Sequence, residues 1–195
     1  MQKEPTKRQK TNQRILTVAE ESFKKCGYAG IGVDGIAKAA GVTSGAFYAH
    51  FGSKNGAFEA ALAAGLEEVI ETIPQYQKNH GNKWVAVFVD YYLGEAHRED
   101  LTGGCAMAAL SPEIARSSEQ LQMLYQEKMT KITDLVAQGL EGETLRFRRD
   151  RAWAMLGILI GGLNVSRAMG GKTAAEEVAK ACAAAAIQAA GSVAG

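Results

Sequence analysis

Apolar residues recur every three or four positions along most of the chain, and glycines separate one run from the next. The first run lies before Lys25 and predicts a helix that starts at Thr6 or Thr11, because this spacing places apolar side chains on one helical face. Gly27 follows where a left-handed helix cap is expected. The chain therefore opens with a helix of about four turns.

Two shorter runs and then a longer one follow, and each predicts a helix. The second helix ends at Gly41, Thr43 is placed to cap the third, and Gly52-Ser53 forms the next break and cap. Pro74 is expected to stop the fourth helix, since proline lacks a backbone N–H. The expected ranges are 33–40, 43–51 and 54–73.

The remaining chain predicts longer helices, over 82–97, 104–116 with an interruption at Ser111-Pro112, 118–140, 149–169 and 173–190. Only three prolines and almost no alternating β-branched runs occur, which favours helix over strand. The predicted fold is all-α with about nine helices.

The composition indicates what class of protein this is and where in the cell it is expected. Hydrophobic residues make up 47% and charged residues 22%, the balance of a globular protein. No run reaches the length that a membrane span needs, and the first residues lack the pattern of a secretory leader. We expect a cytoplasmic protein without a membrane partner.

The charge is uneven along the chain, although its net value is only +1. Residues 1–54 hold nine Lys and Arg against four Asp and Glu, a net +5, which leaves −4 on the remainder. A basic N-terminal segment suits a phosphate-bearing partner, while a solvated charged face is the plainer interpretation.

Two short helices joined by a glycine-containing turn form a candidate helix-turn-helix between Gly32 and Phe51. Apolar residues such as Ile36 and Phe47 would form a small core there. Polar side chains of the second helix would then face a DNA groove. Any small three-helix unit shows the same apolar pattern.

The residues themselves resemble the N-terminal domain of the tetracycline-repressor (TetR/AcrR) family. The resemblance covers about residues 10–60 and rests on Ile36-Ala37-Lys38-Ala39-Ala40-Gly41-Val42, on Tyr48-Ala49-His50-Phe51 and on Ser53-Lys54. It implies a DNA-binding domain at 1–53 with a basic N-terminal arm, and a helical ligand-binding and dimerisation domain at 54–195. It also implies a homodimeric repressor that binds a palindromic double-stranded DNA operator and leaves it on binding a small effector.

By this resemblance several residues contact DNA, some through phosphates and others near base edges. The residues so implied are Thr43, Ser44, Gly45, Ala46, Tyr48, His50 and Lys54. Packing and capping of the small domain is the alternative role for Tyr48 and His50. The sequence departs from the family at Gly32, where a Ser or Thr cap is usual, and at Gly56, where larger residues are common.

Aromatic and methionine side chains on the later helices are candidates for the wall of an effector pocket. Such stripes belong to a core more often than to a ligand site, but they also suit a small apolar or aromatic effector. The candidates are Trp84, Phe88, Tyr92, Met123 and Met155.

The segment 156–163 is apolar on nearly every face and must therefore be covered. With the alanine-rich last helix it resembles the helix pair of the family's dimer interface. Gly157, Gly161 and Gly162 would allow close backbone approach there. A buried central helix of a monomer is the alternative.

Three cysteines, Cys26, Cys105 and Cys182, are far apart and form no Cys-x-x-Cys pair, so free thiols are expected. Cys105 follows two glycines in the first turn of an expected helix, where the helix dipole favours thiolate. It is a candidate redox or electrophile sensor, as in some repressors that this family includes. The plainer interpretation is a small, buried and inert apolar residue.

Two other classes of protein compete with a repressor. A thiol-dependent enzyme would use Cys105 or Glu95 with His97, but no metal-ligand cluster, phosphate loop or cofactor motif accompanies these residues. The other rival is a small-molecule-binding protein without DNA activity.

Overall fold

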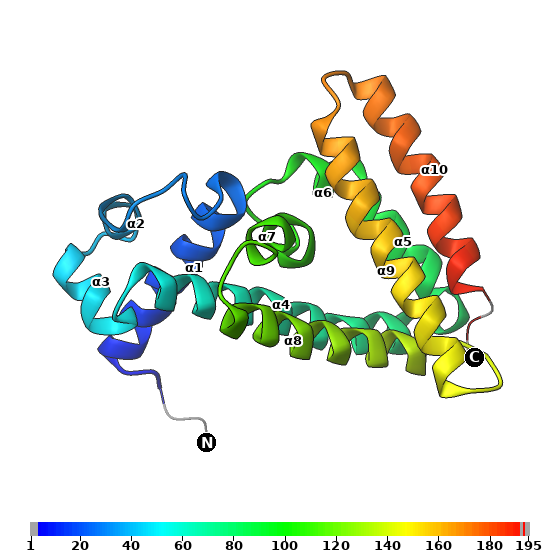
Figure 1. Ribbon diagram of the computed structural model, residues 1–195, viewed down its shortest axis with the longest axis horizontal. Coiled ribbons are helices and arrows are strands. Elements are labelled where there is room, and N and C mark those ends of the chain that lie inside the picture. Colours follow the sequence, from blue (N-terminus) through cyan, green and yellow to red (C-terminus); the bar gives the residue numbers. More distant parts are fainter. Residues whose placement is uncertain (1–3, 192, 194–195) are drawn as a thin grey trace.

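The protein is all-α, as predicted, and its computed structural model describes residues 4–191 and 193. The described residues form ten α-helices and one 3-10 helix, close to the nine expected (Figure 1). None of these helices is both long and apolar enough to cross a membrane. The elements are α1 (Lys7–Cys26), α2 (Val33–Ala39), α3 (Ser44–Phe51), α4 (Lys54–His80), η1 (Gly81–Lys83), α5 (Trp84–Leu93), α6 (Glu95–Glu99), α7 (Ala106–Ile114), α8 (Glu119–Gln138), α9 (Leu145–Ala168) and α10 (Lys172–Ala190).

The helices form two parts, a head of α1–α3 and a body of α4–α10 (Figure 1). Helix α4 leaves the head and runs beneath the body beside α8, while α9 and α10 pair at the opposite end. Helix α1 packs on both α4 and α7. The head therefore contacts the body through the packing of α1 as well as through the covalent connection to α4.

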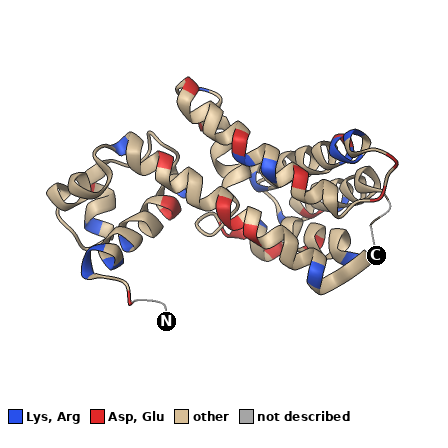
Figure 2. Ribbon diagram, turned by 90° about the horizontal axis from the view of Figure 1, so that it is seen from below, with Lys and Arg blue, Asp and Glu red and all other residues tan. Residues whose placement is uncertain are grey.

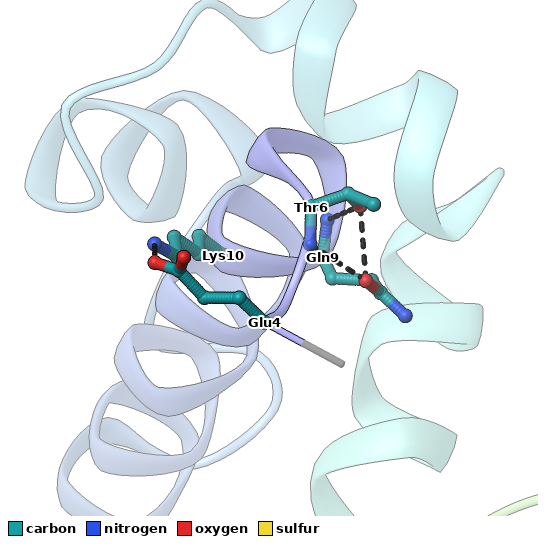
Figure 3. Close-up of polar contacts among 4 residues, drawn as sticks. All are labelled: Glu4, Thr6, Gln9 and Lys10. Carbon is teal, nitrogen blue, oxygen red and sulfur yellow. Dashed lines mark hydrogen bonds and ion pairs between the residues drawn. The ribbon is translucent and has the colours of Figure 1, made fainter. Parts of the chain in front are cut away.

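The first helix starts at the earlier of its two expected positions. The Thr6 hydroxyl accepts from the Gln9 backbone N–H, and the Gln9 side chain accepts from the Thr6 backbone N–H (Figure 3). This capping box satisfies two N–H groups that the helix cannot pair internally. Gly27 ends the helix with φ of 71°, the left-handed value expected.

The buried apolar residues of the head are continuous with those of the body. Ile15, Phe23 and Phe47 are fully buried and pack with Phe58, the first large apolar residue of α4. The Ser53 hydroxyl caps α4 by accepting from the Gly56 N–H. A Cβ on Gly56 would lie 2.2 Å from the Phe51 carbonyl oxygen, which explains why this sequence has no side chain there.

Two expected helix boundaries were wrong, because tertiary packing overrides the local signal. Helix α4 continues past Pro74 to His80. Ile73 is buried and the Gln77 amide donates to the Leu135 carbonyl, so contacts with α8 hold this segment helical. The single helix expected over 82–97 is divided into η1, α5 and α6, with Gly94 in extended conformation between the last two.

The interruption expected at Ser111-Pro112 was wrong, because α7 runs through Pro112 without a break. The proline leaves one carbonyl of that helix without its usual partner. A proline cannot donate a hydrogen bond to the carbonyl four residues earlier, here that of Ala108. The Asn164 side chain of α9 donates to this oxygen at 3.2 Å instead. A side chain 56 positions away thus completes the backbone pairing of α7.

We expect Asn164→Ala to lower the free energy of unfolding by about 1–2 kcal/mol, because it leaves the Ala108 carbonyl unpaired. The same change in a Pro112→Ala background should cost less, since the substituted alanine supplies the backbone N–H that proline lacks. Chemical denaturation of the four proteins in this cycle measures the coupling. Equal losses in both backgrounds would contradict the assignment.

Candidate DNA-binding head and ligand cavity

The turn between α2 and α3 is held by backbone contacts and a small apolar core. Gly41 has φ of 63°, a left-handed value that favours glycine. The Val42 N–H donates to the Ala37 carbonyl at 2.9 Å. Ile36 and Phe47 are fully buried beneath the turn. The two helices are therefore fixed relative to each other, as a helix-turn-helix requires.

The outer face of α3 carries most of the residues expected at DNA. Tyr48 is 51% exposed, and Thr43 and Gly45 are exposed beside it, whereas Phe47 points into the core. The Thr43 hydroxyl caps α3 by accepting from the Ala46 N–H at 3.1 Å. The exposed face is thus formed by small residues around one large aromatic side chain.

Ser44 is tied to the neighbouring helix. Its hydroxyl donates to a carboxylate oxygen of Asp34 in α2 at 2.5 Å. A hydroxyl engaged in a charge-assisted hydrogen bond is not free to read a base edge without losing that bond. In this arrangement Ser44 fixes the crossing of α2 and α3.

Lys54 stands at the N-terminus of α4 over an aromatic support. Its amino nitrogen lies 4.4 Å from the centre of the Tyr28 ring. That ring stacks on Phe23 and meets Phe58 edge-on, and its hydroxyl donates to Asn55. The packing holds the Lys54 charge beside the unpaired N–H groups of the helix end, where an anion is favoured.

His50 is half-buried, and its ring nitrogen Nδ1 lies 3.4 Å from the Asn12 amide of α1. The head also exposes basic side chains that take part in none of the described ion pairs, whereas Lys10 pairs with Glu4 (Figures 2 and 3). These side chains are Lys7, Arg8, Arg14, Lys25 and Lys38. Lys3 of the expected basic arm lies outside the described residues.

The body contains a cavity of about 60 Å³ between α4, α5 and the segment that enters α7. Phe88 and Tyr92, two of the five residues expected at a pocket, line it and are almost fully buried. Tyr91 and His97 also line it, as does Gly65 of α4. Sequence reasoning missed these three, because helical spacing alone does not show which faces meet.

The other three expected pocket residues lie elsewhere. Trp84 is buried in the core and donates its indole N–H to the Gly139 carbonyl at 3.1 Å. Met155 is fully buried in the packing of α9, and Met123 is 55% exposed on α8. Trp84 and Met155 are therefore core residues, the commoner role of such a stripe, and Met123 faces solvent.

A larger and more open groove of about 610 Å³ runs between α5, α6 and α10. Its charged side chains pair with each other: Lys172 contacts Glu95 and Glu99, and Lys180 contacts Glu176. These pairs are exposed to solvent, and Ser166, a buried polar residue in the wall, already donates its hydroxyl to the Leu163 carbonyl. The smaller cavity is therefore the better candidate for an effector site.

His97 joins the cavity wall to the loop before α7. Its Nδ1 donates to the Tyr92 carbonyl at 2.6 Å, so its Nε2 accepts from the Cys105 backbone N–H at 3.3 Å. Burial lowers the pKa of His97, with a smaller contribution from the Arg167 charge. Both ring nitrogens are engaged with backbone groups, so His97 does not act as a base for the Cys105 thiol in this arrangement.

Cys105 is the N-cap residue of α7, close to its expected position. Burial raises the pKa of its thiol, and the lowering effects of the Tyr92 hydroxyl and the α7 backbone amides are smaller. Desolvation of a negative charge thus opposes the helix dipole and outweighs it at this position, which favours the interpretation of Cys105 as a small, inert apolar residue.

One face of α9 is apolar and open to solvent, and on it Trp153 and Gly157 line a hollow together with Tyr125 and Met129 of α8. Trp153 and Val165 are 42% and 47% exposed, and a Cβ on Gly157 or Gly161 would meet no atom within 4 Å. Gly162 lies on the opposite side, where a Cβ would come within 2.6 Å of the Cys182 Cβ. Gly162 therefore serves the contact between α9 and α10 within one chain, which corrects its expected place on the open face.

The comparisons with known proteins agree with the head's geometry. Residues 15–61 match the family described as bacterial regulatory proteins, tetR family. The transcriptional repressor NemR of Escherichia coli K12 is 26% identical over 136 residues, 67% of each chain. The regulatory protein RaaS of Mycobacterium tuberculosis H37Rv is 28% identical over 151 residues, 76% of this chain and 66% of RaaS.

Solved structures extend the likeness in fold to nearly the whole chain. A TetR-family regulator from Cytophaga hutchinsonii superposes with a TM-score of 0.79 at 17% identity, covering 95% of this chain and 98% of that one. The reduced form of E. coli NemR superposes with a TM-score of 0.77 at 18% identity, covering 95% and 97%. At these identities the likeness concerns the fold alone.

We expect Cys105 to react slowly with iodoacetamide at neutral pH, because its thiol pKa is raised and little thiolate is present. Exposed Cys26 provides the reference within the same chain. Mass spectrometry of labelled peptides across pH 5–9 should show Cys105 lagging behind Cys26. Faster labelling of Cys105 would restore the interpretation as a reactive sensor thiol.

Proposed function

The chain belongs to the tetR family of bacterial regulatory proteins, and we propose that it is a ligand-responsive transcriptional repressor. It binds a palindromic operator as a homodimer and leaves the DNA when a small effector occupies the body. The observation that carries this proposal is the rigid α2–turn–α3 unit, with Tyr48 exposed on α3 and Lys54 held at the start of α4. The division into a DNA-binding part, residues 1–53, and a ligand-binding part, residues 54–195, follows from it.

DNA binding combines phosphate contacts around α3 with close approach of its exposed face. Lys54 and Tyr48 contact phosphates, joined by His50 and the Thr43 hydroxyl at the edges of the same surface. Small residues at Gly45 and Ala46 let the helix enter the major groove. Ser44 contributes by holding α3 against Asp34 rather than by reading a base.

The homodimer forms through the open face of α9. A second copy would cover Trp153, Val165 and the backbone at Gly157 and Gly161, which are exposed in one chain. The head lies at the other end of the molecule, so a two-fold axis at this face would leave both heads free (Figure 1). Two heads at fixed spacing match a palindromic site.

Effector release works through α4, which belongs to both parts. Gly65 of α4 lines the cavity, and a Cβ there would lie 2.8 Å from the Ala106 Cβ of α7. The Lys24 side chain of α1 lies within 4 Å of the same point. A ligand that separates α4 from α7 would therefore displace the contact on which the head rests.

Lys54→Ala should weaken binding to all DNA sequences and reduce the slope of log affinity against log salt by about 0.9, the value for one lost phosphate contact. Lys83→Ala, an exposed lysine far from the head, is the matched control and should change neither. Fluorescence anisotropy at several salt concentrations measures both. An unchanged slope would remove Lys54 from the DNA surface, and no binding by the wild type would favour a small-molecule-binding protein.

Gly161→Leu should give monomers, because the new side chain stands on the proposed dimer face and overpacks it. The variant should stay folded, and even gain about 1 kcal/mol in helix propensity, since nothing lies within 4 Å in one chain. Gly162→Leu should instead unfold the α9–α10 pair. Light scattering and thermal unfolding separate the two outcomes, and a Gly161→Leu dimer of unchanged stability would refute the interface.

A further inference from the structure

We propose that the cavity beside Tyr92 recognises the neutral carbonyl oxygen of a compact aromatic ligand, and that the Tyr92 hydroxyl donates the hydrogen bond. This inference rests on the proposed function, because it names the chemical class of the effector. It is carried by a buried donor that the protein leaves unpaired.

The hydroxyl of Tyr92 has no hydrogen-bond partner among the described residues, although its side chain is 2% exposed. The Cys105 thiol lies beside the hydroxyl and interacts with it, but sulfur is a weak acceptor, so the hydroxyl can still donate to a stronger one. Buried hydroxyls are nearly always paired, because desolvation without a partner destabilises the fold. Because Tyr92 also lines the cavity, this donor is available to an acceptor that enters there.

The ionisable groups around the cavity favour a neutral ligand. Burial raises the pKa of Tyr92 and of Cys105 and outweighs the opposing charge of Arg167 at Tyr92, so a negative charge is poorly stabilised here, and exposed Glu68 in the cavity wall adds repulsion. Burial lowers the pKa of His97, so a positive charge is also disfavoured, despite Asp100 nearby. The acceptor that fits is a neutral oxygen.

The shape of the wall indicates an aromatic ligand of one ring. Phe88 and Tyr91 both line the cavity, and the Tyr91 ring stacks on that of His97 with ring centres 5.2 Å apart. The volume of about 60 Å³ equals roughly two water molecules at liquid density, enough for a polar head and part of a ring. Tyr91 is 53% exposed, so it is the side chain free to turn outward and admit the remainder.

Binding of three matched probes tests the class of ligand without DNA present. The probes are 4-fluoroacetophenone, with a neutral carbonyl, 1-ethyl-4-fluorobenzene, with no acceptor, and 4-fluorobenzoate, with a charge. Fluorine NMR titrations should show the ketone binding at least several-fold more tightly than the other two. Equal or tighter binding of the benzoate or the ethylbenzene, or no binding of the ketone, would overturn the proposal.

Tyr92→Phe and Tyr91→Phe form a matched pair that tests the donor. Tyr92→Phe should weaken the ketone about five- to tenfold, the effect of one hydrogen bond, and leave the ethylbenzene unchanged. Tyr91→Phe should change either affinity less than about twofold, because the Tyr91 side chain is exposed to solvent. Equal effects of the two substitutions would contradict the assignment.

The stability of the ligand-free variants provides a second readout. Removal of an unpaired buried hydroxyl should leave the Tm of Tyr92→Phe unchanged or raised. A Tm lowered well beyond that of Tyr91→Phe would mean that the protein itself, or a fixed water, satisfies the hydroxyl, and would overturn the proposal. DNA binding by the ligand-free Tyr92→Phe protein should equal that of the wild type. Failure of the wild type to bind the ketone would thus refute this inference alone. Failure of the wild type to bind DNA would refute only the proposed function.

Discussion

The arrangement of head and body depends on one continuous apolar face along α4. Phe58 packs against the head, and Leu62, Leu66, Ile70 and Ile73 continue the same face beneath the body, all buried. This 27-residue helix is therefore a structural member of both parts. Because packed interiors deform little, a shift of α4 on one side must appear on the other.

Ion pairs between α4 and α8 add to this apolar contact. Glu67 pairs with Lys128 and Lys131 of α8, and the hydrogen bond from Lys128 lowers the pKa of the Glu67 carboxyl. Both ion pairs are partly exposed, so they contribute little to stability and mainly align α4 with α8. The head then presents positive charge to solvent, whereas the cavity in the body is lined mainly by aromatic and apolar side chains. The two surfaces suit chemically different partners.

The head could be predicted from sequence because its determinants are local. Thr43 and Ser53 cap the helices that follow them, and Gly41 takes the left-handed conformation that its turn needs. The body was less predictable, since its determinants are distant in the chain. Pro112 is accommodated by Asn164, and Pro74 by packing on α8, neither of which a local pattern reveals.

The candidate sites show the same division. Spacing placed Phe88 and Tyr92 on one side of α5, but the side of α8 that bears Met123 depends on how the helices cross. Gly161 and Gly162 differ by one position, and one faces solvent while the other faces Cys182. Whether the pKa of the Cys105 thiol is raised or lowered depends on how deeply the thiol is buried, and its position at a helix end did not show this.

In the proposed dimer, two copies of the head bind DNA together, one at each half of a symmetric site. Selection of binding sites from a random double-stranded DNA library by the purified full-length protein tests this arrangement. Enrichment of an inverted repeat, with half-sites about one helical turn apart, is the predicted result. Enrichment of single half-sites without symmetry, or of no sequence, would contradict the account.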